Sequence, residues 1–385
     1  MERGFPLCLQ LWTKTVECTS LPIWYDLLVS LCMDISAFKK IHDKYLRRYV
    51  KRKIKEAQTI ATWPRTQQIL WYIEENIFAW GKRIRPYLIY LSYKLYGGKQ
   101  DDEVIHFWWS TELIHTLALI HDDIIDKGDL RHGIACFHKF ATNIIDSSNK
   151  EHLWMSQAIL AGDLTYAWAY DVLYSQYTFK PDNLRLAQKH MQAMIEEVVV
   201  WQMIDVDSMT GDHVEIAKLE AKNHYKTWQY TFGRPMVTWA ILAGADKKSI
   251  KHLQNIGMRL GKAYQMRDDI LDVTISEWDK TTHYDNKTKF SDIQDGQPTY
   301  ITNYIYEHGS YAHRLAITRA MGKRLSPEQI VELREVCIES WAIAYGTNLL
   351  HTYLEEAKKL IQKIPVTDIT YKEYLFQIVD LLATL

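Results

Sequence analysis

Two acidic segments of the same form indicate metal chemistry. Asp122-Asp123-Ile124-Ile125-Asp126 and Asp268-Asp269-Ile270-Leu271-Asp272 each place aspartates at positions i and i+4, one turn apart on one face of a helix. Stacked carboxylates repel each other, and late in a helix they also oppose its dipole, so a cation should offset them. Mg²⁺ suits this role because it takes one or two carboxylates, water and substrate phosphates as ligands. The predicted metal ligands are Asp122, Asp123, Asp126, Asp268, Asp269 and Asp272.

The repetition of the motif carries more weight than either copy. A single D-D-x-x-D pattern has a high false-positive risk, and its plain interpretation is a solvated helix end. Here both copies come late in apolar helical stretches, which predicts that they face a common cavity. His115 lies two turns before Asp122 on the same stripe. A lone histidine on an apolar face is commonly a core residue, but this alignment makes it a candidate site residue.

A short basic segment is a candidate anion site. Lys82, Arg83 and Arg85 stand between Gly81 and Pro86, at the predicted start of a helix. Backbone N–H groups at a helix N-terminus already favour an anion. Taken alone, the segment fits an ordinary solvated turn better, so its role depends on whether the fold brings it to the acidic motifs.

Helical periodicity dominates the chain and predicts an all-α fold. The 385 residues include only 16 glycines and 9 prolines, about half of the average share, too few for the many turns of a β-sandwich. We expect one large helical bundle around a central cavity over residues 41–385, preceded by a helical N-terminal extension over residues 1–40.

The acidic motifs are predicted to lie on long helices over Glu103–Ile125 and Lys248–Val273. In the second of these, Gly257 and Gly261 allow close helix packing. A third helix is expected over His213–Gly233. The polar segments Gly133–Gln157 and Thr274–Pro298 are predicted to be long loops.

Composition excludes several classes of protein. The net charge of −1 lacks the basic surplus of a nucleic-acid binder. Five scattered cysteines without C-x-x-C pairs indicate reduced thiols in a cytoplasmic protein. The apolar stretches Phe5–Trp12 and Leu21–Phe38 are shorter than a membrane span or interrupted by Asp26 and Asp34, so neither a transmembrane segment nor a signal peptide is expected.

Together, these motifs make the chain resemble the trans-isoprenyl (polyprenyl) diphosphate synthases, in particular geranylgeranyl diphosphate synthases. The resemblance runs from about Thr59 to the end of the chain, and its strength lies in the order of the motifs. They are Gly81–Pro86, Ile114-His115-Thr116, Asp122–Asp126 with Asp129-Leu130-Arg131, Ala161-Gly162-Asp163, Lys226-Thr227 and Asp268–Asp272. The resemblance implies the isoprenoid synthase fold, a prenyltransferase activity and a homodimer.

The same resemblance implies a head-to-tail condensation of isopentenyl diphosphate with an allylic diphosphate. About three Mg²⁺ ions, together with Arg131, Lys226 and Lys287, would neutralise the allylic diphosphate as its C–O bond ionises. Thr227 and Gln265 match positions that place oxygen dipoles near the allylic cation. The aspartates, Lys226, Thr227 and Gln265 form the implied catalytic set. Isopentenyl diphosphate would be held by Lys82, Arg85 and His115, with His132 beside them.

Several positions depart from the resembled pattern. His132 stands in place of a second arginine after the first acidic motif, and Gln297 in place of a lysine in the later D-x-x-x-G-K pattern. A large residue, Trp201, precedes the mid-chain Gln202, and Asn286-Lys287 replaces Gly-Lys. Loss of an arginine and a lysine weakens diphosphate binding.

Two other functions stay open. A terpene synthase on the same scaffold would ionise an allylic diphosphate without chain elongation; His132 and Gln297 favour it slightly, whereas Lys82, Arg85 and His115 favour condensation. A non-catalytic partner subunit is the other alternative, although it would have no need of six aspartates around a cavity.

Product length is predicted from the residues before the first acidic motif. In the resembled family the positions four and five before that motif limit the product, and here they are Ala118 and Leu117, neither of them aromatic. Leu113 and Ile114 lie further from the motif, toward the start of the same predicted helix. A medium-length product is therefore expected, with geranylgeranyl diphosphate first and a somewhat longer chain second.

Overall fold

The computed structural model describes residues 35–79, 81, 83–131, 134–140, 149–207, 216–274, 290–365 and 369–384. Most of the predicted N-terminal extension lies outside these residues, as do three predicted site residues, Lys82, His132 and Lys287. The elements are α2 (Ile35–Ile60), α3 (Pro64–Phe78), α4 (Ile84–Leu95), α5 (Asp101–Ile125), β1 (Leu130–Arg131), β2 (Ile134–Ala135), α6 (Phe137–Phe140), α7 (Lys150–Leu173), α8 (Pro181–Asp207), α9 (Ile216–Asn223), η2 (His224–Gly233), α10 (Arg234–Ala243), α11 (Lys247–Thr274), α12 (Ser291–Gln294), α13 (Tyr300–His308), α14 (Tyr311–Ala320), α15 (Pro327–Glu339), α16 (Ala342–Gln362) and α17 (Thr370–Ala383).

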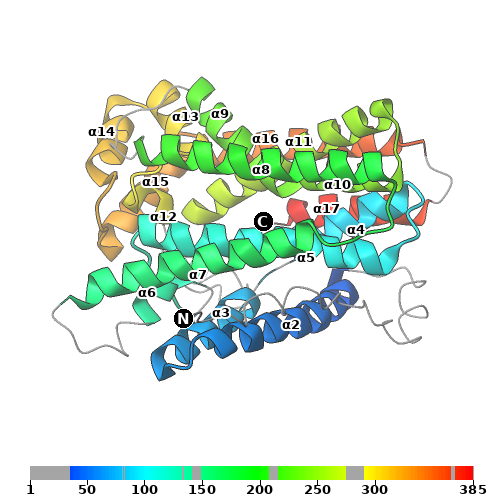
Figure 1. Ribbon diagram of the computed structural model, residues 1–385. Helices are drawn as coiled ribbons and strands as arrows, with labels where there is room; N and C mark the ends of the chain where they lie inside the picture. Colours follow the sequence, from blue (N-terminus) through cyan, green and yellow to red (C-terminus); the bar gives the residue numbers. More distant parts are fainter. Residues whose placement is uncertain are drawn as a thin grey trace, which may run out of the picture. The chain divides into compact units, whose positions relative to one another are not determined.

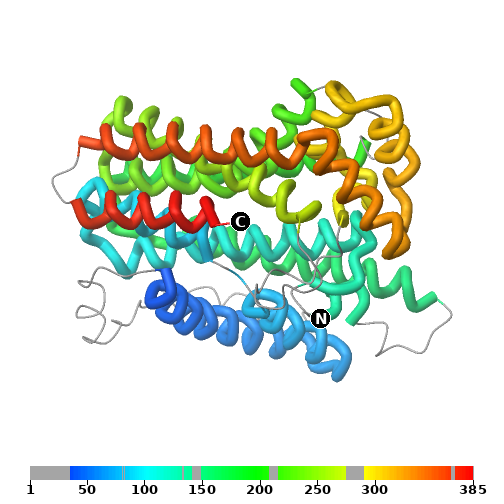
Figure 2. Tube along the Cα trace, turned by 180° about the vertical axis from the view of Figure 1, so that it is seen from behind, coloured from blue at the N-terminus to red at the C-terminus, as the bar shows by residue number. Residues whose placement is uncertain are grey.

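The predicted all-α fold is confirmed. The β1–β2 pair, with Arg131 opposite Ile134, is the only sheet among the described residues. Within the unit from residue 34 onward, long helices run side by side: α5 packs against α7, α10 against α4 and α8, and α11 against α16. Figure 1 shows α7 and α8 on one side of this unit, and Figure 2 shows α16 and α17 on the opposite side. None of the described helices has an apolar stretch long enough to cross a bilayer.

The predicted close packing at Gly257 and Gly261 is present in α11. A Cβ on Gly257 would lie 2.8 Å from the Cα of Gly233, and one on Gly261 would lie 2.6 Å from the Cα of Trp228. Both are closer than a Cβ can approach a backbone atom, so only glycine lets η2 lie this close to α11.

The segment after α9 differs from the predicted helix over His213–Gly233. Residues His224–Gly233 form η2, a π-helix, whose wider turns are rare and occur frequently at functional sites. Lys226 and Thr227 lie on it, so the wider turn determines which way these two side chains point.

The predicted loop over Gly133–Gln157 is wrong over its last part. Helix α7 begins at Lys150 and carries a buried stripe that starts within the expected loop, at Trp154, and continues at Ala158 and Ala161. This spacing of four and three residues is helical. The exposed first turn of the helix, Lys150-Glu151-His152, is polar, and this hid the helical signal in the sequence.

Candidate active site

A cavity of about 1200 Å³ lies between α5, α8, η2 and α11 and collects most of the predicted site residues. Those that line it are Arg85, Ile114, His115, Leu117, Ala118, Asp122, Asp123, Asp126, Arg131, Lys226, Thr227, Gln265, Asp268 and Asp269. The two acidic motifs, 146 residues apart in the sequence, therefore face one space. Asp272 and Leu113 are not among the lining residues.

The first acidic motif is held at the end of α5 by two cations. Arg131 Nε donates to Asp123 Oδ1 at 2.5 Å, and its Nη2 lies 4.0 Å from Asp122 Oδ2. Lys226 Nζ, on η2, lies 3.9 Å from Asp122 Oδ1. Asp126, which is exposed at the cavity, has its pKa raised to about 7 by partial desolvation and by the charge of Asp122. Positive charge next to the motif thus falls short of its negative charge.

The second acidic motif is connected to η2 through a hydrogen-bond chain. Thr227 Oγ1 donates to Gln265 Oε1 at 2.8 Å, and Gln265 Nε2 donates to Asp269 Oδ1 at 2.8 Å. The backbone N–H of Tyr300 donates to the other oxygen of Asp269 at 2.9 Å. Burial raises the pKa of Asp269 well above its ordinary value, and the charges of Asp292 and Asp268 add to this.

Asp272, the third aspartate of the second motif, is bound by neighbouring protein groups. Its Oδ1 accepts hydrogen bonds from the backbone N–H of Ser291 at 2.9 Å and from Ser291 Oγ at 2.7 Å. These contacts attach α12 to the end of α11. Its predicted role as a metal ligand stays a prediction.

The acidic residues of the cavity fit divalent cations bound together with a substrate. Among the described residues, no three His, Cys, Asp or Glu side chains converge closely enough to hold a metal ion by themselves. Mg²⁺ commonly takes only one or two carboxylates and completes its octahedron with water and phosphate. Desolvation is the first cause of the raised pKa of Asp123, Asp126 and Asp269, so burial disfavours their charged forms, and a bound cation would offset that cost.

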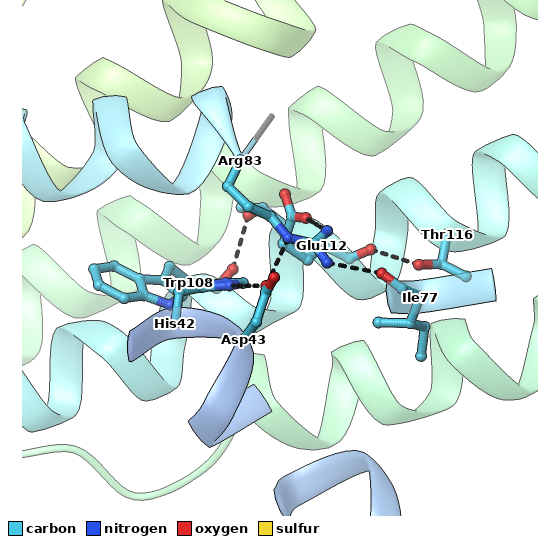
Figure 3. A network of polar contacts seen from close by, with 8 residues as sticks. His42, Asp43, Ile77, Arg83, Trp108, Glu112 and Thr116 are labelled. Atoms are coloured by element: carbon cyan, nitrogen blue, oxygen red, sulfur yellow. Dashed lines mark hydrogen bonds and ion pairs between the residues drawn. The ribbon is translucent and has the colours of Figure 1, made fainter. Parts of the chain in front are cut away.

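The basic segment before α4 is divided between a structural and a cavity-facing arginine. Arg83 is 7% exposed and lies in the left-handed region with φ of 53°. Its Nε donates to Asp43 at 2.7 Å, its Nη1 to Glu112 at 2.6 Å and its Nη2 to the carbonyl of Ile77 at 2.8 Å, as Figure 3 shows. Arg83 therefore anchors the segment to α2 and α5 and is not available to a ligand.

Arg85, in contrast, lines the cavity. Its Nη2 donates to Thr231 Oγ1 at 2.9 Å, and its guanidinium lies 4.7 Å from the ring centroid of Tyr230. The anchor formed by Arg83 also explains Gly81, because a Cβ there would lie 2.9 Å from Arg83 Nη1. Of the arginines in this segment, Arg85 is therefore the one that lines the cavity with the acidic motifs.

Sequence reasoning missed two parts of the cavity. One is an apolar stripe on α8 at helical spacing, formed by Ile195, Val198, Val199, Met203 and Val206, on either side of Gln202, which the resembled pattern had already indicated. Its period was visible in the sequence, but the partner of that face was not. The other is a group in which Asp205 pairs with both Lys222 and Lys226, brought together by α8, α9 and η2 over distances that sequence spacing does not reveal.

Trp108 and Trp109, nearer the start of α5, are not among the residues that line the cavity. Trp108 is 1% exposed and packs on Phe38 with ring centroids 5.0 Å apart. Trp109 packs on Tyr49 with centroids 5.4 Å apart. Of the residues proposed to limit product length, Ile114, Leu117 and Ala118 line the cavity.

Comparisons with known proteins agree on one family. The family model described as "Polyprenyl synthetase" matches residues 66–337. A geranylfarnesyl diphosphate synthase of Aeropyrum pernix is 27% identical over 79% of this chain and 90% of its own length. A geranylgeranyl diphosphate synthase of Sulfolobus acidocaldarius is 26% identical over 72% of this chain and 78% of its own.

A solved structure also has the same fold. A geranylgeranyl pyrophosphate synthase from Corynebacterium glutamicum, complexed with isoprenyl diphosphate and magnesium, superposes with a TM-score of 0.80 at 25% identity. The match covers 89% of this chain and 98% of that one. An octaprenyl diphosphate synthase of Haemophilus influenzae is 24% identical over 90% of this chain and 95% of its own length, so relatives with different product lengths are similar to this chain.

Proposed function

The chain belongs to the polyprenyl synthetase family, and from this premise we propose that it condenses isopentenyl diphosphate with an allylic diphosphate to give a medium-chain polyprenyl diphosphate. The observation that carries the proposal is the meeting of both acidic motifs with Lys226, Arg131 and Arg85 in one cavity. Opposed carboxylates and cations of this kind suit a diphosphate bound with divalent cations.

The residues have distinct roles in this reaction. Mg²⁺ ions held by the aspartates of the two motifs would supply Lewis-acid charge at the leaving diphosphate. Lys226 and Arg131 bind the same diphosphate, so negative charge is stabilised there as the allylic C–O bond breaks. Thr227 Oγ1 and Gln265 Oε1, already aligned by their hydrogen bond, direct oxygen dipoles at the allylic cation.

The second substrate completes the step. Arg85 binds the diphosphate of isopentenyl diphosphate, with Lys82, His115 and His132 as further proposed contacts. The double bond of isopentenyl diphosphate donates its electron pair to the cation, and a new C–C bond forms. The proton lost from the adjacent carbon passes to the released pyrophosphate.

Incubation with labelled isopentenyl diphosphate, an allylic diphosphate and Mg²⁺ tests the proposal directly. Elongated diphosphates are the expected product. Consumption of the allylic diphosphate alone, with release of a hydrocarbon or alcohol, would support the terpene synthase alternative instead. No turnover of either substrate would favour a non-catalytic partner subunit.

Arg85→Ala should raise KM for isopentenyl diphosphate by about tenfold to a hundredfold, with a smaller change for the allylic substrate. A charge-assisted hydrogen bond contributes roughly 1.5–3 kcal/mol. Arg259→Ala, which removes an arginine paired with Glu356 away from the cavity, is the control and should change neither constant. Equal effects of Arg85→Ala on both substrates would show that Arg85 does not distinguish the two sites.

Leu117→Phe should shorten the product. Leu117 lies five residues before Asp122, about 7.5 Å along the helix axis, and lines the cavity. A larger ring there fills space that the growing chain needs, whereas Leu117→Ile keeps the volume and should keep the product distribution. Product sizing by chromatography checks this. An unchanged chain length in Leu117→Phe would place the limit elsewhere, with the α8 stripe as the next wall to test.

We also propose that the protein is a cytoplasmic homodimer. Exposed apolar side chains on α7 and α8 support a second copy as the occupant of this side: Leu160 is 59% exposed, Tyr170 54% and Val200 51%. Burying such side chains between two copies removes apolar surface from water. Light scattering on the purified protein, compared with Leu160→Glu, checks the oligomeric state.

A further inference from the structure

A lysine that the mechanism above does not use lies in the cavity wall. Lys222, on α9, lines the cavity. Its Nζ forms an ion pair with Asp205 Oδ1 at 2.5 Å and donates to Gln297 Oε1 at 2.6 Å. An ammonium carries three donors. Within the described residues one donor is held by Gln297 and the ammonium is paired with Asp205, which leaves donor capacity for a ligand.

The charge of Lys222 is only partly balanced. Asp205 is 1% exposed, and its other oxygen accepts from Lys226 Nζ at 2.8 Å. Burial alone would raise the pKa of Asp205, but Lys226 and Lys222 hold it below the ordinary value, so the carboxylate is ionised at neutral pH. One carboxylate serves two ammonium groups, and the remaining partner of Lys222, Gln297, is neutral.

The contacts with Asp205 also show where the ammonium of Lys222 lies relative to that of Lys226. Because Lys222 and Lys226 bind the two oxygens of one carboxylate, their ammonium groups are neighbours on the same wall. Lys226 is in turn 3.9 Å from Asp122. An anion that reaches Lys226 beside the first acidic motif therefore comes within reach of Lys222 as well.

We propose that Lys222 is a further substrate-binding residue, which contacts the diphosphate of the allylic substrate beside Lys226. This inference rests on the proposed function, because it assigns Lys222 to the same diphosphate. It also gives Gln297 a role. As a neutral acceptor, Gln297 holds the ammonium of Lys222 beside the end of its own side chain, so Lys222 supplies charge next to a position where the resembled pattern has a lysine.

The alternative is a purely structural role, in which Lys222 joins α9 to α8 and to the segment before α13. The two roles predict different responses to moving the charge. If Lys222 binds substrate, a positive charge supplied from position 297 should replace it. If Lys222 is only structural, a charge from position 297 cannot restore the lost link to α9.

The experiment measures calorimetric binding of inorganic pyrophosphate with Mg²⁺ to the full-length protein. Lys222→Met should weaken binding by about tenfold to a hundredfold, the range for loss of a charge-assisted bond. Lys222→Arg should stay within about threefold of the wild type, and the double variant Lys222→Met with Gln297→Lys should regain most of the affinity. Lys218→Met, one turn away on α9 and exposed, is the matched control and should bind as the wild type does.

Steady-state kinetics assign the effect to a substrate. In Lys222→Met the KM for farnesyl diphosphate should rise more than the KM for isopentenyl diphosphate. Wild-type-like binding by Lys222→Met, or a loss that neither Lys222→Arg nor the double variant repairs, overturns the inference. Because wild-type turnover is measured in the same assay, a wild type that elongates normally while Lys222→Met is unimpaired refutes only the role of Lys222. A wild type that neither binds pyrophosphate nor elongates refutes the proposed function with it.

Discussion

Asp122→Asn and Asp268→Asn are each expected to lower kcat by at least about a thousandfold while the protein stays folded. Each substitution removes one carboxylate that lines the cavity. In the proposed mechanism that negative charge would help to hold Mg²⁺ beside the substrate diphosphate before the C–O bond breaks. Loss of a single preorganised electrostatic contact commonly costs a hundredfold to a thousandfold in kcat, and loss of a metal ligand removes more than one contact. Turnover at saturating substrates and Mg²⁺ is the measurement.

The stability of these variants should hold or rise. The charge of Asp122 contributes, after desolvation, to the raised pKa of Asp126, about 7. A carboxyl with a raised pKa in the folded state destabilises the fold as pH rises through that value. Asp122→Asn removes the repulsion, so in Mg²⁺-free buffer its Tm relative to wild type should increase from pH 6 to pH 8.

An aspartate on the protein surface provides a matched control for the loss of a carboxylate in the cavity. Asp182→Asn alters an aspartate whose side chain is 90% exposed at the start of α8, and it should change neither kcat nor Tm measurably. Near-wild-type Mg²⁺-dependent turnover in Asp122→Asn or Asp268→Asn would show that the metals do not bind where both motifs meet.

The helices that carry the acidic motifs, and the acidic residues themselves, could be predicted from the sequence because both depend on the spacing of nearby residues. The aspartates at i and i+4 specify a shared face wherever the helix lies, and the apolar stretches before them require a buried helix. Their meeting in one cavity followed from the second copy of the motif. The shared face and the burial of the apolar stretch are properties of single helices, and both are present in the folded protein.

Other features depend on partners far apart in the sequence. Arg83 looked like one of three anion-binding cations, yet Asp43 and Glu112, supplied by α2 and α5, bind it inside the protein. Nothing in the spacing of Gly81–Pro86 distinguishes Arg83 from Arg85. The pairing of Lys222 with Gln297 joins residues 75 positions apart, and it too needs the fold.

The π-helix η2 could be predicted from the sequence only in part. Its ten residues show no period that separates a π-helix from an α-helix, because the two differ by less than one residue per turn over so short a span. Its closest neighbours, Gly257 and Gly261, were nevertheless visible in the sequence as a small-residue pair. The close approach of another helix to α11 could therefore be predicted, but the π-helical conformation of that helix could not.

Gly261→Ala is expected to lower kcat by about a hundredfold and to lower Tm by several degrees. The added methyl would lie 2.6 Å from the Cα of Trp228 and 2.7 Å from its Cβ, so the backbone of η2 must move. Overpacking of this kind costs typically 1–3 kcal/mol. Thr227, the residue before Trp228, loses its 2.8 Å hydrogen bond to Gln265 when η2 shifts, and a displacement of about 1 Å at a positioned group can cost a hundredfold in rate.

Gly346→Ala is the matched control for this effect. Gly346 lies in α16, which packs on α11, but a Cβ there would meet only side-chain atoms: Ile301 Cδ1 at 2.9 Å, Ile270 Cγ1 at 3.2 Å and Met266 Sδ at 3.2 Å. Ends of flexible side chains can rotate away where a backbone cannot, so kcat should stay close to wild type and Tm should fall less. Turnover and thermal unfolding of both variants decide the matter. If Gly261→Ala were as active as Gly346→Ala, the close approach of η2 to α11 would not be what positions Thr227 and Lys226 for the reaction.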